Sequence, residues 1–241
     1  MADALLTLRG VHTHIGHYHI LQGVDLAVPR GELTMLLGRN GAGKTTTLRT
    51  ILGLWRASAG SIRFEAEEIA PWQTPAVADL GIAYVPESMG IFAGLTVREN
   101  LVLAARRGPP DEKRLDWIFR FFPPMKKFWS LPAGLLSGGQ KQMLSISRAI
   151  VEPRKLVLID EPTKGLAPAI INNLIEAFAE LKKTDTTILM VEQNFHAAKS
   201  LGDSVAVMDA GRIVHTGRMA DLAADSALQT RLLGLSLEAH Q

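Results

Sequence analysis

The sequence contains no cysteine, which excludes disulfide bridges and thiolate metal sites and is compatible with a reducing compartment. It also lacks an excess of charge of one sign, because 26 lysine and arginine residues face 24 aspartate and glutamate residues. Nucleic-acid-binding proteins usually cluster basic residues on one face, so this balance gives no argument for nucleic acid as a partner. No apolar run reaches the roughly 18 residues that a membrane helix needs, and the start of the chain does not resemble a signal peptide.

The length of 241 residues, with 47% hydrophobic and 21% charged residues, is typical of one well-folded domain with or without a subdomain. No internal repeat, low-complexity segment or long coiled coil is present. We therefore expect a folded protein that stays in the cytoplasm unless a partner holds it to a membrane.

A glycine-rich stretch at residues 36–46 reads LLGRNGAGKTT and fits the pattern G-x-x-x-x-G-K-[ST] of a phosphate-binding loop. It follows an apolar run at 33–37 that predicts a buried strand, and it opens a segment at 45–54 that can be helical. Glycine lets backbone N–H groups turn toward phosphates, lysine supplies a mobile cation, and a threonine hydroxyl suits Mg²⁺. The predicted nucleotide-binding residues are Gly38, Asn40, Gly41, Gly43, Lys44, Thr45 and Thr46, with Lys44 also catalytic and Thr45 a magnesium ligand.

Hydrophobic periodicity predicts an alternation of strands and helices around this loop, typical of an α/β fold. The predicted strands cover 5–8, 24–28, 33–37, 61–64, 82–85, 156–159, 187–191, 204–208 and 212–216. The predicted helices outside the middle of the chain cover 72–79, 169–183, 194–201 and 219–233.

Carboxylates end two of the predicted strands. Glu87 follows the strand at 82–85, and Asp160 and Glu161 follow the strand at 156–159. The carboxyl ends of parallel strands meet at the ligand-binding crevice of open α/β sheets. Asp160 is therefore a candidate Mg²⁺ partner, Glu161 a candidate base for the attacking water, and Glu87 a sensor of Mg²⁺ or water or else a solvated loop acid.

Residues 88–151 differ from the rest because strand-like runs disappear and amphipathic helical patterns appear at 97–107, 111–122 and 141–151. Asp111 is a candidate N-cap of the second helix, whose closely spaced apolar residues predict core packing. The run at 123–127 breaks the chain. LSGGQ at 136–140 precedes the third helix, with Ser137 as a candidate N-cap and paired glycines that predict a second anion-binding turn.

Four histidines lie within residues 12–19. A metal site is one interpretation, although no carboxylate or cysteine lies nearby. A loop near the nucleotide base is another, in which Tyr18 or a flanking histidine stacks on adenine. A loop that faces solvent is the third.

These motifs resemble those of the ATP-binding subunits of ABC transporters. Residues 38–45 match the Walker A loop of that family, 136–140 its signature motif and 156–161 its Walker B strand with the catalytic glutamate. The resemblance extends from about 5 to 233 and implies a single ABC ATPase domain, 1–241. That domain would have a RecA-like P-loop core with an antiparallel β subdomain (1–87 and 152–241) and an inserted α-helical subdomain (88–151). It also implies head-to-tail dimerisation, with Ser137 and Gly139 contacting a γ-phosphate bound in the partner.

The chain departs from the usual family pattern at several positions. Glu87 replaces a glutamine, Gln193 the switch histidine and Ala167 an aspartate. The three changes together are similar to the branch that imports branched-chain amino acids and related polar amides. Glutamine can hydrogen-bond a phosphate or water but cannot become a cation near neutral pH, so Gln193 is a candidate catalytic residue of reduced electrostatic strength. The usual adenine-stacking tyrosine would fall at Ile15, so Tyr18 is its candidate substitute.

The resemblance implies an ATP-hydrolysing subunit that uses ATP and Mg²⁺ to power import of branched-chain amino acids or a related polar solute. Its expected partners are an identical or different second cassette, membrane permease subunits and a solute-binding protein. The expected location is peripheral, on the cytoplasmic face of the inner or plasma membrane. The permease would dock near 88–95, where Met89, Ile91 and Phe92 form an apolar surface unless they are buried within this chain.

Other functions remain as alternatives. An importer of urea or short amides fits the same residues. A non-transport ABC ATPase of DNA repair would carry long coiled coils or zinc inserts, which this sequence lacks. An ABC ATPase of translation would carry two cassettes, whereas 241 residues allow one. An ATP-binding regulator without turnover is disfavoured by the presence of Lys44 and Glu161, and a GTPase by the lack of an Asn-Lys-x-Asp motif.

Overall fold

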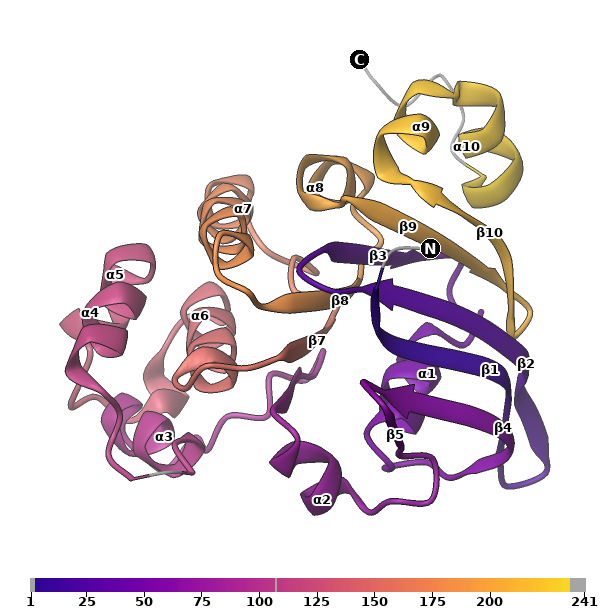
Figure 1. Cartoon of the computed structure of the whole chain (residues 1–241). Helices are drawn as coiled ribbons and strands as arrows, with labels where there is room; N and C mark the ends of the chain where they lie inside the picture. Colours follow the sequence, from indigo (N-terminus) through magenta and orange to yellow (C-terminus); the bar gives the residue numbers. More distant parts are fainter. Residues whose placement is uncertain (1–2, 107, 235–241) are drawn as a thin grey trace.

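The computed structural model describes residues 3–106 and 108–234, which form two sheets and surrounding helices (Figure 1). A four-stranded antiparallel sheet has the order β2-β1-β4-β5, and a six-stranded sheet has the order β10-β9-β3-β8-β7-β6. In the larger sheet only β10 is antiparallel to its neighbour. The strands are β1 Ala4–Ile15, β2 Tyr18–Pro29, β3 Leu33–Leu37, β4 Ala57–Phe64, β5 Glu67–Glu68, β6 Ile82–Val85, β7 Leu156–Asp160, β8 Thr187–Val191, β9 Ser204–Asp209 and β10 Arg212–Arg218.

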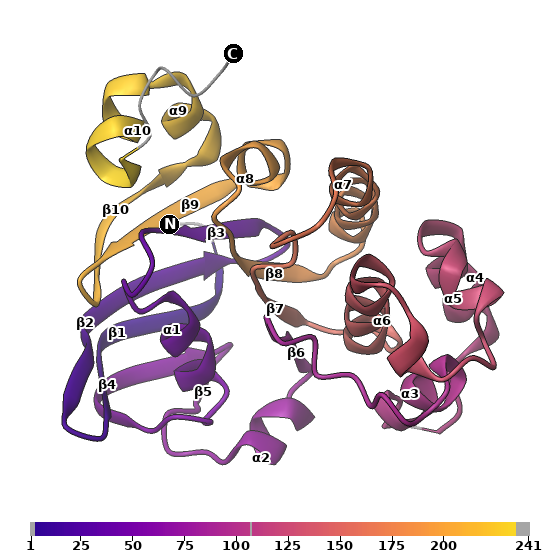
Figure 2. The same ribbon diagram turned by 180° about the vertical axis from the view of Figure 1, so that it is seen from behind.

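The helices fall into separate groups around the sheets (Figures 1 and 2). Helix α1 lies between the two sheets, while α3, α4 and α5 lie together at one end of the molecule and α9 and α10 at the other. The helices are α1 Lys44–Ile51, α2 Thr74–Asp79, α3 Val97–Ala104, α4 Glu112–Phe121, α5 Pro123–Lys127, α6 Gly138–Ile150, α7 Pro168–Lys182, α8 Phe195–Leu201, α9 Met219–Ala224 and α10 Ser226–Leu233, with a 3-10 turn at Ala133–Leu135.

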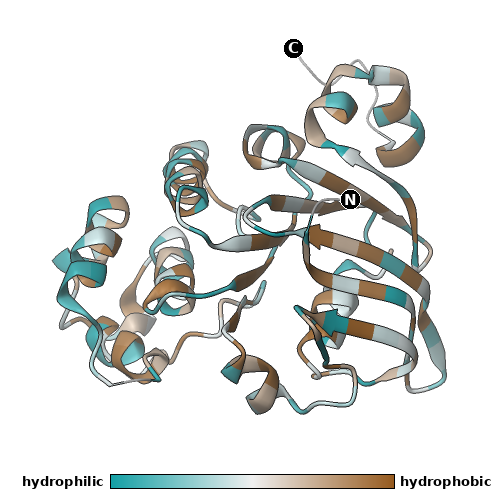
Figure 3. Cartoon of the chain, viewed as in Figure 1, coloured by the Kyte–Doolittle hydropathy of each residue, from teal (hydrophilic) through white to brown (hydrophobic). Residues whose placement is uncertain are grey.

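Alternating residues of the parallel strands supply two separate cores, because successive side chains of a strand point to opposite faces. Met35 and Leu37 pack with the helices that cover one face of the larger sheet. Leu36 faces the other way and packs with Leu48 of α1 and with the antiparallel sheet. Figure 3 shows the apolar residues running along these strands. The parallel sheet is therefore buried on both faces and holds its strand ends in fixed positions.

The middle of the chain is helical, as predicted. The N-cap of α4 is Asp111, whose side chain accepts a hydrogen bond from the Arg114 N–H, and Ile118 and Phe122 are fully buried. The expectation that this dense apolar set belongs to the core is confirmed. Among the described residues of 88–151, the only strand-like pairing is an isolated bridge between Thr96 and Pro132.

Several predicted element bounds are wrong. The first two strands are far longer than 5–8 and 24–28, since β1 and β2 form one hairpin that contains the histidines. The run at 123–127 does not remain irregular but forms α5, because proline is tolerated in the first turn of a helix. The helix predicted at 97–107 ends at Ala104, and Arg107 lies outside the described residues. The helix predicted at 219–233 is divided at Asp225, which caps α10.

Candidate functional site

The glycine-rich loop joins the end of β3 to the start of α1 and holds a buried lysine. Gly38 has φ 145°, and a Cβ there would lie 2.1 Å from the Met208 carbonyl oxygen, so only glycine fits. Lys44 is 5% exposed, and its Nζ donates to the carbonyls of Gly38 at 2.8 Å and Arg39 at 3.0 Å. Burial lowers the pKa of Lys44, although Glu161 and Asp160 oppose this. A buried cation whose hydrogen-bond partners are two neutral carbonyls is well prepared to receive an anionic ligand.

Asp160 is fully buried at the end of β7 and lies directly beside the loop. It accepts hydrogen bonds from the Thr45 hydroxyl at 3.1 Å and from the Tyr84 hydroxyl at 3.3 Å. Burial raises the pKa of Asp160, and burial together with Asp160 raises the pKa of Tyr84 to about 12, so the phenol remains a donor near neutral pH. Within 3–106 and 108–234, no lysine or arginine forms an ion pair with Asp160. Hard oxygen donors around a buried carboxylate that has no ion-pair partner fit a divalent cation such as Mg²⁺.

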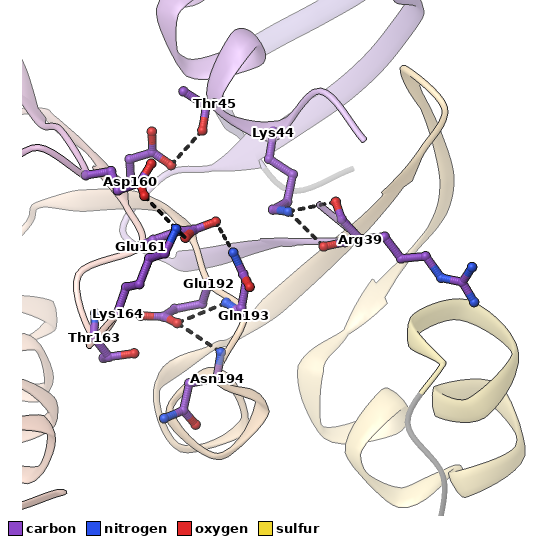
Figure 4. A network of polar contacts seen from close by, with 12 residues as sticks. Arg39, Lys44, Thr45, Asp160, Glu161, Thr163, Lys164, Glu192, Gln193 and Asn194 are labelled. Atoms are coloured by element: carbon purple, nitrogen blue, oxygen red, sulfur yellow. Dashed lines mark hydrogen bonds and ion pairs between the residues drawn. The ribbon is translucent and has the colours of Figure 1, made fainter. Parts of the chain in front are cut away.

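Glu161 and Gln193, the two predicted catalytic side chains, are in direct contact. The Gln193 side-chain amide donates to Glu161 Oε1, and the Glu161 backbone N–H donates to the Val191 carbonyl at 2.9 Å. Glu161 has φ 47°, a left-handed conformation that is uncommon outside glycine and is often found at functional sites. Figure 4 shows both side chains near Asp160 and Thr45, at the carboxyl edge of the parallel sheet.

Glu192 is a buried carboxylate that the motif assignments did not include. One of its oxygens accepts from the Thr163 N–H at 3.1 Å, and the other accepts from Gln193 N–H at 3.0 Å and Asn194 N–H at 3.1 Å (Figure 4). Burial raises its pKa, while the hydrogen bonds lower it. Glu192 therefore ties the loop after β7 to the loop after β8. Its position at the end of a buried strand, the same signal that identified Asp160, could have found it.

Glu87 is exposed at the end of β6 and forms an ion pair with Lys164, with 2.6 Å between Oε1 and Nζ. No hydrogen bond joins Glu87 to Thr45 or Asp160 in the described parts of the chain, so its role at a metal stays a prediction. Lys164 also lies 3.2 Å from Glu161 Oε2. No pattern in the sequence indicates this lysine, because its contact with Glu87 joins residues far apart in the chain.

The signature motif lies at the start of α6. Ser137 is the N-cap as predicted, in a capping box with Gln140, but the helix begins at Gly138 and not at 141. The paired glycines therefore belong to the first helical turn. Ser137 is exposed, and a Cβ at Gly139 would lie 3.1 Å from Ile170. No hydrogen bond links Ser137 or Gly139 to the loop at 38–46 within the described residues.

The histidines and Tyr18 lie on the β1–β2 hairpin and not in the predicted loop. His12 Nδ1 and His19 Nε2 are 2.9 Å apart, and the rings of His14 and His19 stack with centroids 4.2 Å apart. Across the described ranges, no three histidine, aspartate or glutamate side chains are arranged to hold a metal ion, which gives the metal interpretation of the histidines no support. Tyr18 is 76% exposed near the tip, and its stacking on adenine stays a prediction. Backbone hydrogen bonds link the hairpin to the glycine-rich loop through Gly211. The Gln22 N–H donates to the Gly211 carbonyl, and the Gly211 N–H donates to the Ala42 carbonyl.

A cavity of about 230 Å³ lies against the loop. Its lining includes Gly38, Arg39, Asn40, Glu192, Gln193 and Phe195. The loop, the switch position after β8 and the buried carboxylate Glu192 thus border one space.

A glycine loop with a buried lysine, followed by acidic strand ends at the carboxyl edge of a parallel sheet, defines a phosphate-loop nucleotide-binding ATPase. The family model described as "ABC transporter" matches residues 21–164. The chain belongs to the ABC transporter family and is an ATP-hydrolysing subunit of such a transporter.

Named relatives agree with this assignment. The chain is 38% identical over 232 residues to the high-affinity branched-chain amino acid transport ATP-binding protein BraG of Pseudomonas aeruginosa, covering 95% of this chain and 100% of that protein. It is 33% identical to the probable branched-chain amino acid transport ATP-binding protein LivF of Archaeoglobus fulgidus, covering 95% and 99%.

Solved structures show the same fold. An ATP-binding subunit of an ABC transporter matches with a TM-score of 0.81 and 30% identity, covering 97% of this chain and 96% of that one. An ATP-binding cassette in its ADP conformation matches with a TM-score of 0.79 and 26% identity, covering 93% and 96%. Within 3–106 and 108–234, none of the helices combines the length and apolar character needed to cross a membrane.

Proposed function

We propose that this chain powers the import of branched-chain amino acids through a permease, with ATP and Mg²⁺ bound at the loop and strand-end carboxylates. The main support is the pair of contacts at the edge of the parallel sheet, in which Thr45 meets Asp160 and Gln193 meets Glu161. The substrate class rests on the names of the relatives, BraG and LivF, and on the substitutions Glu87, Gln193 and Ala167.

Each residue has a proposed chemical role. Lys44 and the loop N–H groups hold the phosphates, and Thr45 and Asp160 hold Mg²⁺, which supplies charge neutralisation when bound. Glu161 accepts a proton from the attacking water, and Gln193 orients that water through its amide. Because Gln193 already contacts Glu161, both groups can act on one water molecule. Gln193 carries no charge, so it contributes less stabilisation of developing negative charge than a protonated histidine would.

We propose that the functional unit is a dimer of cassettes. Ser137 is exposed and Gly139 is partly exposed at the start of α6, a helix of 13 residues. Within the described residues, neither forms a hydrogen bond with the glycine-rich loop at 38–46. The Ser137 hydroxyl, the Gly139 N–H and the helix dipole suit a phosphate bound by the partner. The partner can be a second copy or a different cassette. ATP bound between the two chains would favour the closed dimer, and hydrolysis would reopen it.

The permease is proposed to dock beside residues 88–95, in the helical part that spans 88–151. Phe92 is 49% exposed, whereas Met89 and Ile91 are partly buried. A hollow of about 350 Å³ borders this segment and is lined in part by Pro86, Met89 and Gly90. An exposed aromatic ring beside a hollow is a common feature of protein-binding surfaces. The remaining segments, 1–87 and 152–241, are proposed as the catalytic core, and a solute-binding protein would deliver the solute.

Uptake of labelled leucine tests the function. Cells lacking this chain would receive the wild type, Glu161→Gln or the surface control Glu176→Gln, and unlabelled valine, urea and short amides would compete. We expect the wild type and the control to restore uptake, valine to block it, and Glu161→Gln to fail while still binding ATP. Inhibition by urea or amides in place of valine would reassign the solute, and full uptake by Glu161→Gln would remove its role as the base.

A further inference from the structure

Lys164 lies between two carboxylates that come from different strand ends. Its Nζ is 2.6 Å from Glu87 Oε1, after β6, and 3.2 Å from Glu161 Oε2, after β7. Glu87 and then Glu161 raise the pKa of Lys164, so it remains a cation near neutral pH. A single cation therefore joins the residue proposed as the base to a residue at the start of the proposed permease-facing segment.

The Glu161 carboxylate has one identified contact at each oxygen. Gln193 donates to Oε1, while Oε2 is shielded from solvent and has no hydrogen bond within the described residues beyond its ion pair with Lys164. The backbone of Glu161 is in the left-handed region, where local preference does not favour this residue. The orientation of the carboxylate consequently depends on these two partners. Removing Lys164 would take away the only ion-pair partner that Oε2 has within the described residues.

Glu87 is connected to the helical part through its neighbours in the chain. The Ser145 hydroxyl donates to the Met89 carbonyl at 2.6 Å, and the Arg148 guanidinium donates to the Gly90 carbonyl. Both donors belong to α6, the helix that begins with the signature motif. A displacement of residues 88–95 would move Glu87 and so change the position of Lys164.

We propose that Lys164 is a positioning residue that holds the Glu161 carboxylate in place and links it to Glu87. This inference rests on the proposed role of Glu161 as the base. The Lys164 side chain is 56% exposed, and exposed ion pairs contribute little to folding stability. Its effect is therefore expected on the catalytic step and not on the fold.

The first test compares steady-state ATP hydrolysis by the full chain and by Lys164→Met. Outer partners of catalytic groups typically contribute about 10- to 100-fold, so we expect kcat to fall by about that factor while the KM for ATP stays close to wild type. The melting temperature should not change, and Lys164→Arg should restore most of kcat because it keeps the charge. Lys183→Met is the matched control, since Lys183 also forms an exposed ion pair three residues from its partner, Glu180.

The second test is a double-mutant cycle with Glu87→Gln. If Glu87 acts through Lys164, adding Glu87→Gln to Lys164→Met causes no further loss of kcat. If the two losses multiply, Glu87 acts independently and the link is overturned. Wild-type kinetics of Lys164→Met, with Glu161→Gln inactive, would overturn the positioning role alone. Full turnover by Glu161→Gln would instead overturn the proposed function of Glu161.

Discussion

Replacing Glu192 with glutamine tests whether one buried carboxylate holds together the loops that follow β7 and β8. In the wild type, two carboxylate oxygens accept three backbone N–H groups, those of Thr163, Gln193 and Asn194. Glutamine offers one oxygen and one NH₂ group. In either amide orientation, at least one backbone N–H therefore faces a donor and loses its partner.

The magnitude follows from this count. An unsatisfied buried donor costs about 1–3 kcal/mol. Glutamine also removes a buried charge. The net loss in the free energy of unfolding should therefore stay below the roughly 3–5 kcal/mol seen when a buried ion pair is broken. We expect the free energy of unfolding of Glu192→Gln to fall by about 1–3 kcal/mol. For a chain of this size, each kcal/mol lowers the melting temperature by about 2–4 °C.

Calorimetry of the full chain, together with steady-state ATP hydrolysis, measures both consequences. Glu176→Gln is the control, because Glu176 is exposed on α7 and such a change is usually worth less than about 0.5 kcal/mol. The activity of Glu192→Gln should fall as well, since Gln193 and the loop after Glu161 lose their common anchor. A melting temperature and a kcat that both match the control would show that Glu192 does not hold the two loops together.

Three further predictions concern the loop, the signature motif and pH. Gly38→Ala should abolish ATP binding in a titration assay, because its Cβ would lie 2.1 Å from a backbone carbonyl oxygen. Ser137→Ala and Thr96→Ala each remove the N-cap of a capping box and should lower stability by about 1 kcal/mol, but only Ser137→Ala should also impair ATP hydrolysis. Because burial raises the pKa of Glu192 above 4.5, the folded state binds its proton more tightly. The free energy of unfolding of the wild type, relative to Glu192→Gln, should therefore rise as the pH falls through the raised pKa toward 4.5, as urea titrations can measure.

Much of the parallel sheet and of the candidate site follows from local sequence patterns. The strands at 33–37, 82–85 and 187–191 have the predicted bounds, because short apolar runs between polar or glycine residues describe buried parallel strands well. Thr45 and Asp160, both assigned to Mg²⁺ from their motifs, lie in hydrogen-bond contact although β8 separates β3 from β7 in the sheet.

Other features depend on contacts that no local pattern encodes. The β1–β2 hairpin continues through the histidines, whose rings stack on one another, and the periodicity of apolar residues does not register such polar pairs. The first turn of α6 contains two glycines, which have low helix propensity, and it is stabilised by the capping box of Ser137 and Gln140. The bridge from Lys164 to Glu87 joins separate strand ends and arises only from the tertiary fold.

Helix α6 joins the two surfaces proposed to contact the partner cassette and the permease. Its 13 residues span about 20 Å, with the exposed Ser137 at one end, the Ser145 contact to the Met89 carbonyl in the middle and the Arg148 contact to the Gly90 carbonyl near the other end. A well-packed helix of this length moves as a rigid rod. If a permease docks near residue 90 as proposed, a movement that it imposes on α6 would therefore be carried along the helix to Ser137, and the two proposed contacts would not shift independently.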